Sequence, residues 1–319
     1  MTQTPSSSGQ SPKRRESAAS RFLHATELDT RLLGMVAALA MIWIGFHFFG
    51  LFKTGFGAFL TPRNLWNLSV QTASIGIMAT GMVLVIVTRN IDLSVGSILG
   101  FCAIAMGMMQ VHILPQFLGL GHPAIWIITV IFGMAVGTVI GALHGWLIAY
   151  LAIPAFIVTL GGLLVWRGAA FLVARGETIS PVDATFALLG GGPYGAVGAM
   201  GSWIVGLIGC ATVIYMIVAG RRKRKTFGFP QRPVWAEYFL SALGCGVIVG
   251  AVLLVNSYYW PRGIVRAYAA ENNIEIPEGG LFISHGFAIP VLILLGVGIG
   301  MTILIDRKST RLNSSHSGE

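Results

Sequence analysis

Charged residues are scarce in this sequence. Asp, Glu, Lys and Arg together make up 10% of its 319 residues, whereas soluble domains usually carry about 25%. So few charges cannot cover the surface of a soluble globule of this size. Hydrophobic residues account for 55% of the chain, and the mean hydropathy is +0.76. The composition therefore predicts that lipid rather than water surrounds most of the chain.

Cysteine pairs and the common enzyme motifs are also missing. The three cysteines, Cys102, Cys210 and Cys245, are widely separated and show no CxxC spacing, which excludes a disulfide framework or a zinc site of the usual pattern. No GxxxxGK[ST] loop is present, so the chain is not by itself a P-loop ATPase. HExxH and GxSxG are absent as well. We therefore expect a chain that is not an enzyme and that holds neither a metal nor a cofactor.

Long apolar runs dominate what remains. A transmembrane helix needs about 20 mostly apolar residues, and the stretch Leu93–Trp166 alone contains no Asp, Glu, Lys or Arg. These runs are continuous rather than alternating, which argues against a β-barrel, and in lipid each span must satisfy its own backbone hydrogen bonds. The sequence thus predicts an all-α polytopic transmembrane helix bundle. The runs predict about eight spans, namely residues 32–52, 64–88, 93–111, 124–151, 155–174, 201–219, 236–257 and 285–305.

Polar segments flank the predicted membrane domain at both ends. Residues 1–31 are rich in Ser and Thr and carry a basic cluster, which predicts a disordered tail. Residues 32–305 form the membrane domain. Residues 306–319 are polar and follow the last span abruptly; they are either a native tail or sequence foreign to the protein.

The formal net charge is +9, and its location bears on orientation. No basic stripe interleaved with aromatic residues is present, so we expect no nucleic-acid partner. About three quarters of the Lys and Arg residues lie in the N-terminal segment and in every second connection after it. The positive-inside rule therefore predicts a cytoplasmic N-terminus.

The most informative polar stretch separates spans two and three. It runs from Arg89 to Ser97 and includes Asn90, Asp92 and Ser94. Asp92 can cap the following helix by accepting N–H bonds from Ser94 or Val95, and Ser94 and Ser97 share a face. Two interpretations remain open: a capped turn at the membrane boundary, or a polar helix start that lines a solute path.

Polar side chains within predicted spans are the other candidates. Gln71 and Ser74 share a face of span two, and each can bond either a sugar hydroxyl or a neighbouring helix. Arg167 either reaches outward to water, faces a path, or pairs with Asp183 or Glu177. We interpret His144 as a hydrogen-bonding link between helices.

Glycines recur every four residues in span four. Gly133, Gly137, Gly141 and Gly145 fall near one face and allow a neighbouring backbone to approach closely. We interpret them as a packing feature.

Several of these residues together resemble a known family. Gln71-Thr72-Ala73, Gly76-Ile77, Gly81-Met82 and Asp92-Leu93-Ser94-Val95-Gly96-Ser97 are similar to the signature of bacterial ABC permeases for ribose, xylose, arabinose and galactosides. Phe156-Ile157-Val158-Thr159-Leu160 with Arg167-Gly168 resembles the fifth-helix pattern of the same family and adds Thr159 to the path candidates. The resemblance extends from about Asn64 to Ile305.

The resemblance implies a permease subunit that carries a monosaccharide, xylose or a related pentose, across the bacterial inner membrane. It implies three protein partners besides lipid: a second permease copy, a cytoplasmic ATPase subunit and a periplasmic sugar-binding protein. Residues from Lys308 onward do not match the family, which leads us to expect a C-terminally truncated chain. An ion-coupled secondary transporter is the alternative, but such proteins place ionisable groups near the membrane midplane, where Arg167 is nearly alone.

Overall fold

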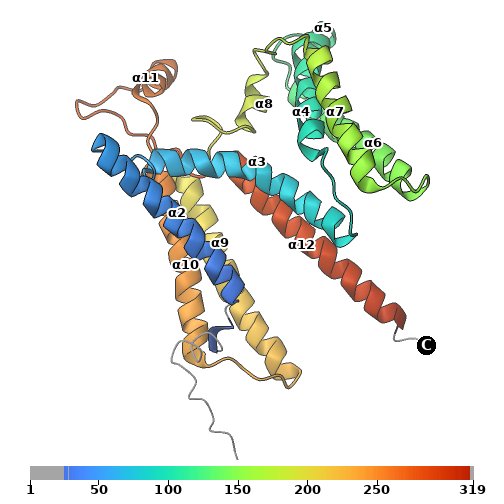
Figure 1. Cartoon of the computed structure of the whole chain (residues 1–319). Helices are drawn as coiled ribbons and strands as arrows, with labels where there is room; N and C mark the ends of the chain where they lie inside the picture. The colour runs from blue at the N-terminus through green and yellow to red at the C-terminus, as the bar shows by residue number, and fades with distance from the viewer. Residues whose placement is uncertain (1–24, 28, 317–319) are drawn as a thin grey trace, which may run out of the picture. The chain divides into compact units, whose positions relative to one another are not determined.

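The computed structural model describes residues 25–27 and 29–316, with side chains described as far as residue 304 (Figure 1). The described chain is helical apart from its connections and two isolated bridges, which confirms the all-α prediction. It divides into two compact units. One contains α2 and most of α9 and α10, and the other contains the remaining helices. Most of the predicted N-terminal tail lies outside the described residues.

In the described part of the chain, seven helices are long and apolar enough to cross a membrane. The ends of these helices lie close to the ends of the first seven predicted spans, because an uncharged run must be about 20 residues long to cross the hydrocarbon core. They are α2 (Thr30–Thr54), α3 (Pro62–Val87), α4 with its continuation (Val95–Leu118), α6 (Ala124–Ala149), α7 (Ala155–Ala174), α9 (Gly198–Thr226) and α10 (Val234–Asn256). The short helices α8 (Ala184–Leu188) and α11 (Arg262–Glu271) were not predicted.

The third span is longer than predicted. α4 (Val95–Met108) continues through a π-helical turn (Met109–Ile113) into α5 (Leu114–Leu118), so a break at His112 is wrong. Within the turn the Leu114 N–H donates to the Met109 carbonyl, five residues back. Because Pro115 has no N–H to offer, a widened turn before it lets the helix continue to Gly119.

The eighth predicted span begins too early. α12 runs from Ile289 to His316, and its described apolar part is Ile289–Leu304. The four residues before it form loop contacts instead of a helical turn. The His285 N–H donates to the Tyr258 carbonyl at 3.0 Å, and the Phe287 N–H donates to the Ser202 hydroxyl at 2.8 Å. These contacts use the backbone groups that a longer helix would need.

A buried aromatic cluster holds this loop to the start of α3. The Trp66 indole N–H donates to the Gly286 carbonyl at 2.8 Å, and its ring lies 4.9 Å from the His285 ring. His285 stacks on Tyr258 at 4.1 Å, and burial lowers the pKa of His285. Further along the same helices, Leu294 of α12 packs over Gly76 of α3. The pair α3–α12 is therefore fixed at its loop end and along its length.

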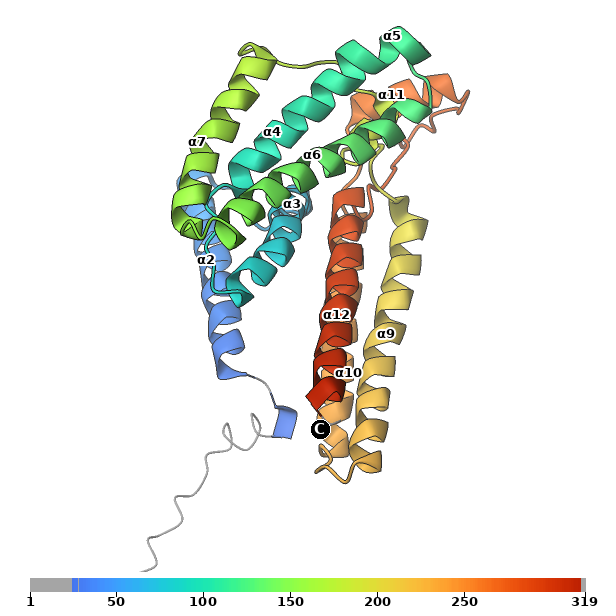
Figure 2. The ribbon, with the colours of Figure 1, turned by 90° about the vertical axis from the view of Figure 1, so that its right-hand side faces the viewer.

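The helices α4, α6 and α7 pack against one another as a second group within the same unit (Figures 1 and 2). Met106 of α4 fills the space above Gly133 of α6. The start of α4 and the faces of α6 and α7 that meet it contain the polar groups described below.

In the other unit, small residues bring α9 and α10 together. Gly206 and Gly209 of α9 face Val252 and Ile248 of α10, and Gly244 of α10 faces Val213 of α9. Close approach at glycine is a common way for membrane helices to pack, because lipid gives no hydrophobic drive for association. None of the residues of α2 is buried.

Ion pairs gather at one end of this unit. The Arg224 guanidinium donates two bonds to the Glu27 carboxylate at 2.7 Å each, and Arg232 donates a third at 2.6 Å. Arg221 pairs with Glu237. The segment before α2 is thereby tied to the α9–α10 connection.

This tie is expected to loosen only in acid. The hydrogen bonds from Arg224 and then Arg232 lower the pKa of Glu27 from 4.5 to about 2. A carboxylate with a lowered pKa stabilises the fold above about pH 4.5, and that contribution disappears as the pH falls toward 2. A spin label at Phe229→Cys in a cysteine-free background should keep constant mobility from pH 8 to pH 5 and become more mobile below pH 4.5.

The variant Glu27→Gln should give the mobile spectrum at every pH, whereas Glu275→Gln, in a different loop, should behave as the parent. The change in stability should stay below about 1 kcal/mol because Glu27 is partly exposed and exposed pairs contribute little. An unchanged spectrum in Glu27→Gln would show that these ion pairs do not hold the connection.

Candidate functional site

The polar turn before α4 is organised around one carboxylate. The Asp92 Oδ1 atom accepts the Ser94 backbone N–H at 2.7 Å and the Ser94 hydroxyl at 2.6 Å. The Ser97 hydroxyl donates to the Ser94 carbonyl at 2.7 Å. Asp92 therefore forms the local N–H bond to Ser94 that the spacing predicts, just ahead of the first residue of α4.

This turn continues into the interior through His144 of α6. The Ser94 side chain is fully buried, and its hydroxyl lies 3.5 Å from His144 Nδ1. On the other side of the ring, the indole Nε1–H of Trp166 in α7 donates to His144 Nε2 at 3.1 Å. The prediction that His144 links helices by hydrogen bonds agrees with this geometry. Trp166 was not predicted to take part.

The direction of these bonds follows from the donors. An indole nitrogen can only donate, so His144 Nε2 must accept, and a neutral imidazole then carries its proton on Nδ1. That proton points to the Ser94 hydroxyl, which in turn donates to Asp92. Donation thus runs from Trp166 through His144 and Ser94 to Asp92. We call these four residues the buried network.

Two further residues of α7 support the buried network. The buried Thr159 hydroxyl lies 2.8 Å from the Ala155 carbonyl and 3.3 Å from the Ile91 carbonyl, which places the segment before α4 against α7. At Gly162, a Cβ atom would lie 2.5 Å from His144 Cε1. Only glycine leaves room here for the imidazole to lie against the α7 backbone.

Every donor of the buried network has an acceptor inside the protein. On the acceptor side, Asp92 Oδ1 takes both Ser94 bonds, whereas Oδ2 of this partly exposed residue has no partner among the residues that the structure describes. The network therefore has one carboxylate oxygen left for a ligand and no free N–H or O–H donor. Groups of three or more metal-ligating side chains do not occur among the residues that the structure describes. The arrangement suits the fixing of α4 against α6 and α7 better than contact with a solute.

The remaining path candidates are placed differently. Gln71 and Ser74 are exposed on α3, and Arg167 is exposed on α7. Within residues 25–27 and 29–304, we find no side-chain hydrogen bond or ion pair of these three. The Asn90 amide bonds locally to Thr88.

The predicted alternative of an Arg167–Asp183 ion pair is not found in the described chain. Asp183 instead caps α8 by accepting the Phe186 N–H at 2.9 Å, and its own N–H donates to the Gln110 side chain at 3.1 Å. Glu177 forms no ion pair in that region either. The candidate set therefore separates into an interior group whose donors are all used and three exposed groups with free hydrogen-bonding capacity.

The glycine series on α6 packs over only part of its length. A Cβ at Gly133 would meet the Met106 sulfur at 2.2 Å, and one at Gly137 would lie 3.7 Å from the Cys102 sulfur. Gly141 and Gly145 have nothing within 4 Å, so a continuous packing face is not found in the described chain. Because a helix turns every 3.6 residues, each four-residue step rotates the series by about 40°. Its end is therefore directed away from α4.

Two residues of this region, Trp166 and Gly162, are not among the candidates drawn from sequence. The sequence predicts His144 as a link between helices but does not identify its partner. One signal was available, because Gly162 and Trp166 are four residues apart and share a face, and a buried indole usually finds an acceptor. The sequence contains no indication that the acceptor is on α6.

Comparison with known proteins gives one family. Residues 64–228, just over half of the chain, match the family described as branched-chain amino acid transport system / permease component. The chain is 34% identical over 243 residues to the xylose transport system permease protein XylH of Escherichia coli strain K12. The alignment covers 76% of this chain and 57% of the relative. The chain therefore spans little more than half the length of that relative.

Two other relatives support the same assignment. The inner membrane ABC transporter permease protein YjfF of Escherichia coli strain K12 is 29% identical over 278 residues, with 81% of this chain and 80% of the relative covered. The autoinducer 2 import system permease protein LsrC of Photorhabdus luminescens is 42% identical over 103 residues, with 32% and 28% covered. No solved structure matches the chain.

The resemblance that the polar motifs of α3, α4 and α7 indicate is thus confirmed by comparison over most of the chain. Seven membrane-length apolar helices in the described residues and the matched stretch 64–228 lead to the same conclusion: this polytopic chain belongs to the branched-chain amino acid transport system / permease component family.

Proposed function

We propose that the chain is the membrane-spanning subunit of an ABC importer that carries a monosaccharide, xylose or a related pentose. The single observation that carries this proposal is the 34% identity to a xylose transport system permease over 243 residues. The membrane-length helices agree with such a role. The ion-coupled alternative has no support from the relatives, whose names describe permease proteins of a xylose transport system and of an autoinducer 2 import system.

For the topology, we propose an inner-membrane protein with a cytoplasmic N-terminus. The ion pairs of Glu27 with Arg224 and Arg232 require that the start of α2 and the end of α9 lie on the same side of the membrane. An even number of crossings between these points meets that requirement, and the six helices α2, α3, α4, α6, α7 and α9 provide it. The basic cluster at the end of α9 then supports the cytoplasmic assignment.

For the solute path, we propose Gln71, Ser74 and Arg167 as the groups that contact solute or a second permease copy. Exposed polar side chains on a membrane helix are costly against lipid, so a neighbouring subunit or water is expected to cover them. Asp92, Ser94, Ser97 and Thr159 act indirectly by fixing the start of α4. The ATPase subunit and the periplasmic sugar-binding protein are partners under this proposal.

The test is dependence of uptake on the ATPase. Radiolabelled xylose uptake should be measured in cells that express the chain together with an ATPase subunit and a sugar-binding protein of a xylose transport system, and again with the P-loop lysine of the ATPase replaced. Uptake should require the intact ATPase and should resist a protonophore while cellular ATP is maintained. Uptake that persists without the ATPase would reject the proposal.

Asp92→Asn is expected to leave both membrane abundance and uptake close to those of the parent. An Asn oxygen can accept the same two Ser94 bonds. The N-cap of α4 is Ser94, not Asp92, so Asp92 acts through these two bonds alone. Asp92→Ala should lower the free energy of unfolding by about 1–2 kcal/mol, because two Ser94 donors lose their acceptor. Heating in detergent followed by size-exclusion chromatography measures this loss. If Asp92→Asn abolished uptake at normal abundance, the carboxylate charge itself would be required.

A further inference from the structure

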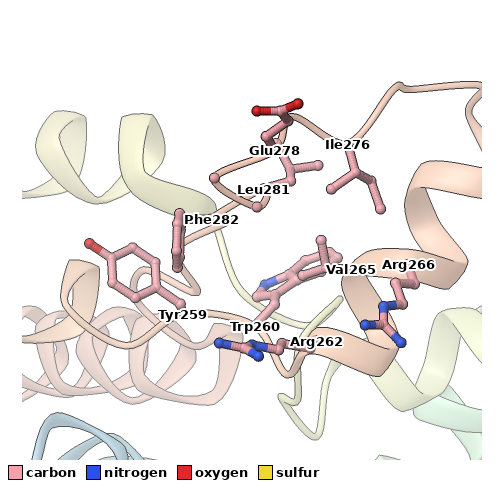
Figure 3. Close-up of a pocket in the computed structure, with 11 residues that line it drawn as sticks. Tyr259, Trp260, Arg262, Val265, Arg266, Ile276, Glu278, Leu281 and Phe282 are labelled. Carbon is pink, nitrogen blue, oxygen red and sulfur yellow. The ribbon is translucent and has the colours of Figure 1, made fainter.

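A cavity of about 420 Å³ lies in the connection between α10 and α12 (Figure 3). It is within the range of small-molecule sites, roughly 300–1,000 Å³. The lining comes from the loop before α11, from α11 itself and from the loop after it. All of these residues lie outside the stretch 64–228 that matches the family.

Aromatic rings form the most ordered part of the wall. Trp260 contacts the rings of Tyr194 at 5.0 Å and Tyr268 at 5.5 Å, and its backbone N–H donates to the Ile283 carbonyl at 2.8 Å. Tyr259 and Phe282 meet edge to face at 5.4 Å. The cavity therefore has a wall of flat apolar rings whose positions are set by several independent contacts.

Polar groups without partners accompany the rings. The Trp260 Nε1–H is buried and has no hydrogen-bond partner. Arg262 and Arg266, one turn apart on α11, and Glu278 in the following loop also line the cavity, and no ion pair of these three occurs in the described part of the chain. Figure 3 shows Trp260 between Phe282 on one side and Val265 and Arg266 on the other, with Glu278 at the edge.

The combination indicates a class of ligand. Trp260 presents its ring to the cavity, since its Nε1–H is buried in the wall. Arginine groups only donate hydrogen bonds, whereas an ionised glutamate only accepts them. A hydroxyl group does both, so a neutral polyhydroxylated molecule can bond to either wall while its C–H faces lie on the rings. A simple anion would suit the arginines but would meet repulsion from Glu278. We propose that this cavity is a binding site for a neutral monosaccharide, separate from the membrane path.

This inference rests on the proposed function for its role. Under the proposed topology, the α10–α12 connection is on the external side, from which an importer receives its sugar. A site there would hold the sugar before it reaches the helices. The binding itself can be tested without transport.

The test uses the full chain in nanodiscs and saturation-transfer NMR with D-xylose as the probe. Xylose binding is expected, and neither inorganic phosphate nor D-glucuronate should compete with it. Competition by either anion would overturn the proposal, since it would identify an anion site. Absence of xylose binding would overturn it as well.

Paired variants locate the site. Glu278→Ala should weaken xylose binding by about tenfold, the usual result of losing one good hydrogen bond in a ligand site. Trp260→Phe should weaken it by a smaller factor, because the apolar ring on the wall becomes smaller while the Nε1–H that it removes is buried. Glu275→Ala, three residues from Glu278 and not part of the lining, and Trp146→Phe on α6 should leave the affinity unchanged. Glu278 is exposed, so its variant should fold even if Trp260→Phe does not. Equal affinity in Glu278→Ala and Glu275→Ala would place the sugar elsewhere and overturn the proposal.

The two proposals fail in different experiments. ATPase-dependent uptake with no xylose bound at the cavity would refute the cavity site and leave the importer function intact. Xylose binding that Glu278→Ala weakens, in a protein whose uptake does not depend on the ATPase, would support the site and refute the importer.

Discussion

Replacing Gly286 with alanine is expected to destabilise the protein by about 3 kcal/mol or more and to reduce the folded protein in the membrane. Gly286 has a φ of +72°, and a left-handed conformation costs a residue with a Cβ roughly 1–2 kcal/mol. In addition, the new Cβ would lie 2.2 Å from the Gly198 carbonyl oxygen and 2.4 Å from the Ser202 hydroxyl. The first of these is backbone and cannot turn aside.

The consequence reaches the aromatic cluster at the start of α3. The Gly286 carbonyl accepts the Trp66 indole N–H, and the next residue, Phe287, donates its N–H to the same Ser202 hydroxyl. Moving Gly286 to relieve the overlap would break both bonds. The Trp66 ring would also lose its place against His285.

Two matched variants separate the causes. Gly280→Ala also has a positive φ, +87°, but its Cβ would make only ordinary contacts at 3.8 Å, so it should show the conformational term alone, about 1 kcal/mol. Gly246→Ala on α10 has open space and a helical backbone and should be neutral or slightly stabilising. Thermal unfolding in detergent, followed by size-exclusion chromatography, ranks the three. A Gly286→Ala variant no worse than Gly280→Ala would mean that the close contact is not formed.

The membrane helices could be predicted from sequence because lipid imposes a simple rule on them. α7 begins and ends at the predicted residues 155 and 174, and α6 differs only at its end. Hydrocarbon has no partners for backbone groups, so an uncharged run of sufficient length must be a helix. Where other partners are available the rule weakens, as at His285, whose backbone N–H bonds to Tyr258 and shortens the last span.

The sequence predicts the local contacts of the site but not the contacts between helices. The difference follows from how far apart the contacting residues are in the sequence. Asp92 and Ser94 are two residues apart, so their bond follows from local geometry. Ser94 and His144 are 50 residues apart, and their meeting depends on which of several similar apolar helices lie together. Hydropathy cannot decide that, since lipid and helix faces are equally apolar. The cavity near Trp260 is not predictable in this way, because its lining comes from two loops and from the short helix α11, which the long apolar runs do not indicate.

The second large effect is expected at Gly162, and it tests the buried network directly. Alanine is intrinsically better than glycine in a helix by about 1 kcal/mol, so Gly162→Ala should stabilise α7 if nothing lay nearby. Its Cβ would instead lie 2.5 Å from His144 Cε1 and 2.8 Å from Nε2. Trp166 and Ser94 contact the His144 ring on opposite sides. To make room for the methyl group, the ring must therefore move and lose at least one of these two hydrogen bonds. We expect a net loss of about 1–3 kcal/mol, measured by the same thermal assay.

Gly161→Ala is the matched control, because it is one residue away on the same helix with nothing within 4 Å; it should be neutral or stabilising. His144→Ala should itself destabilise the protein by about 1–3 kcal/mol, since the Trp166 N–H loses its acceptor in a buried place. The double variant Gly162→Ala/His144→Ala should then be no less stable than His144→Ala alone, because the obstacle to the new methyl group has gone. Such non-additivity is expected only of residues in contact. Additive losses would mean that α6 and α7 do not meet at this point, and that Asp92 and Ser94 are anchored in some other way.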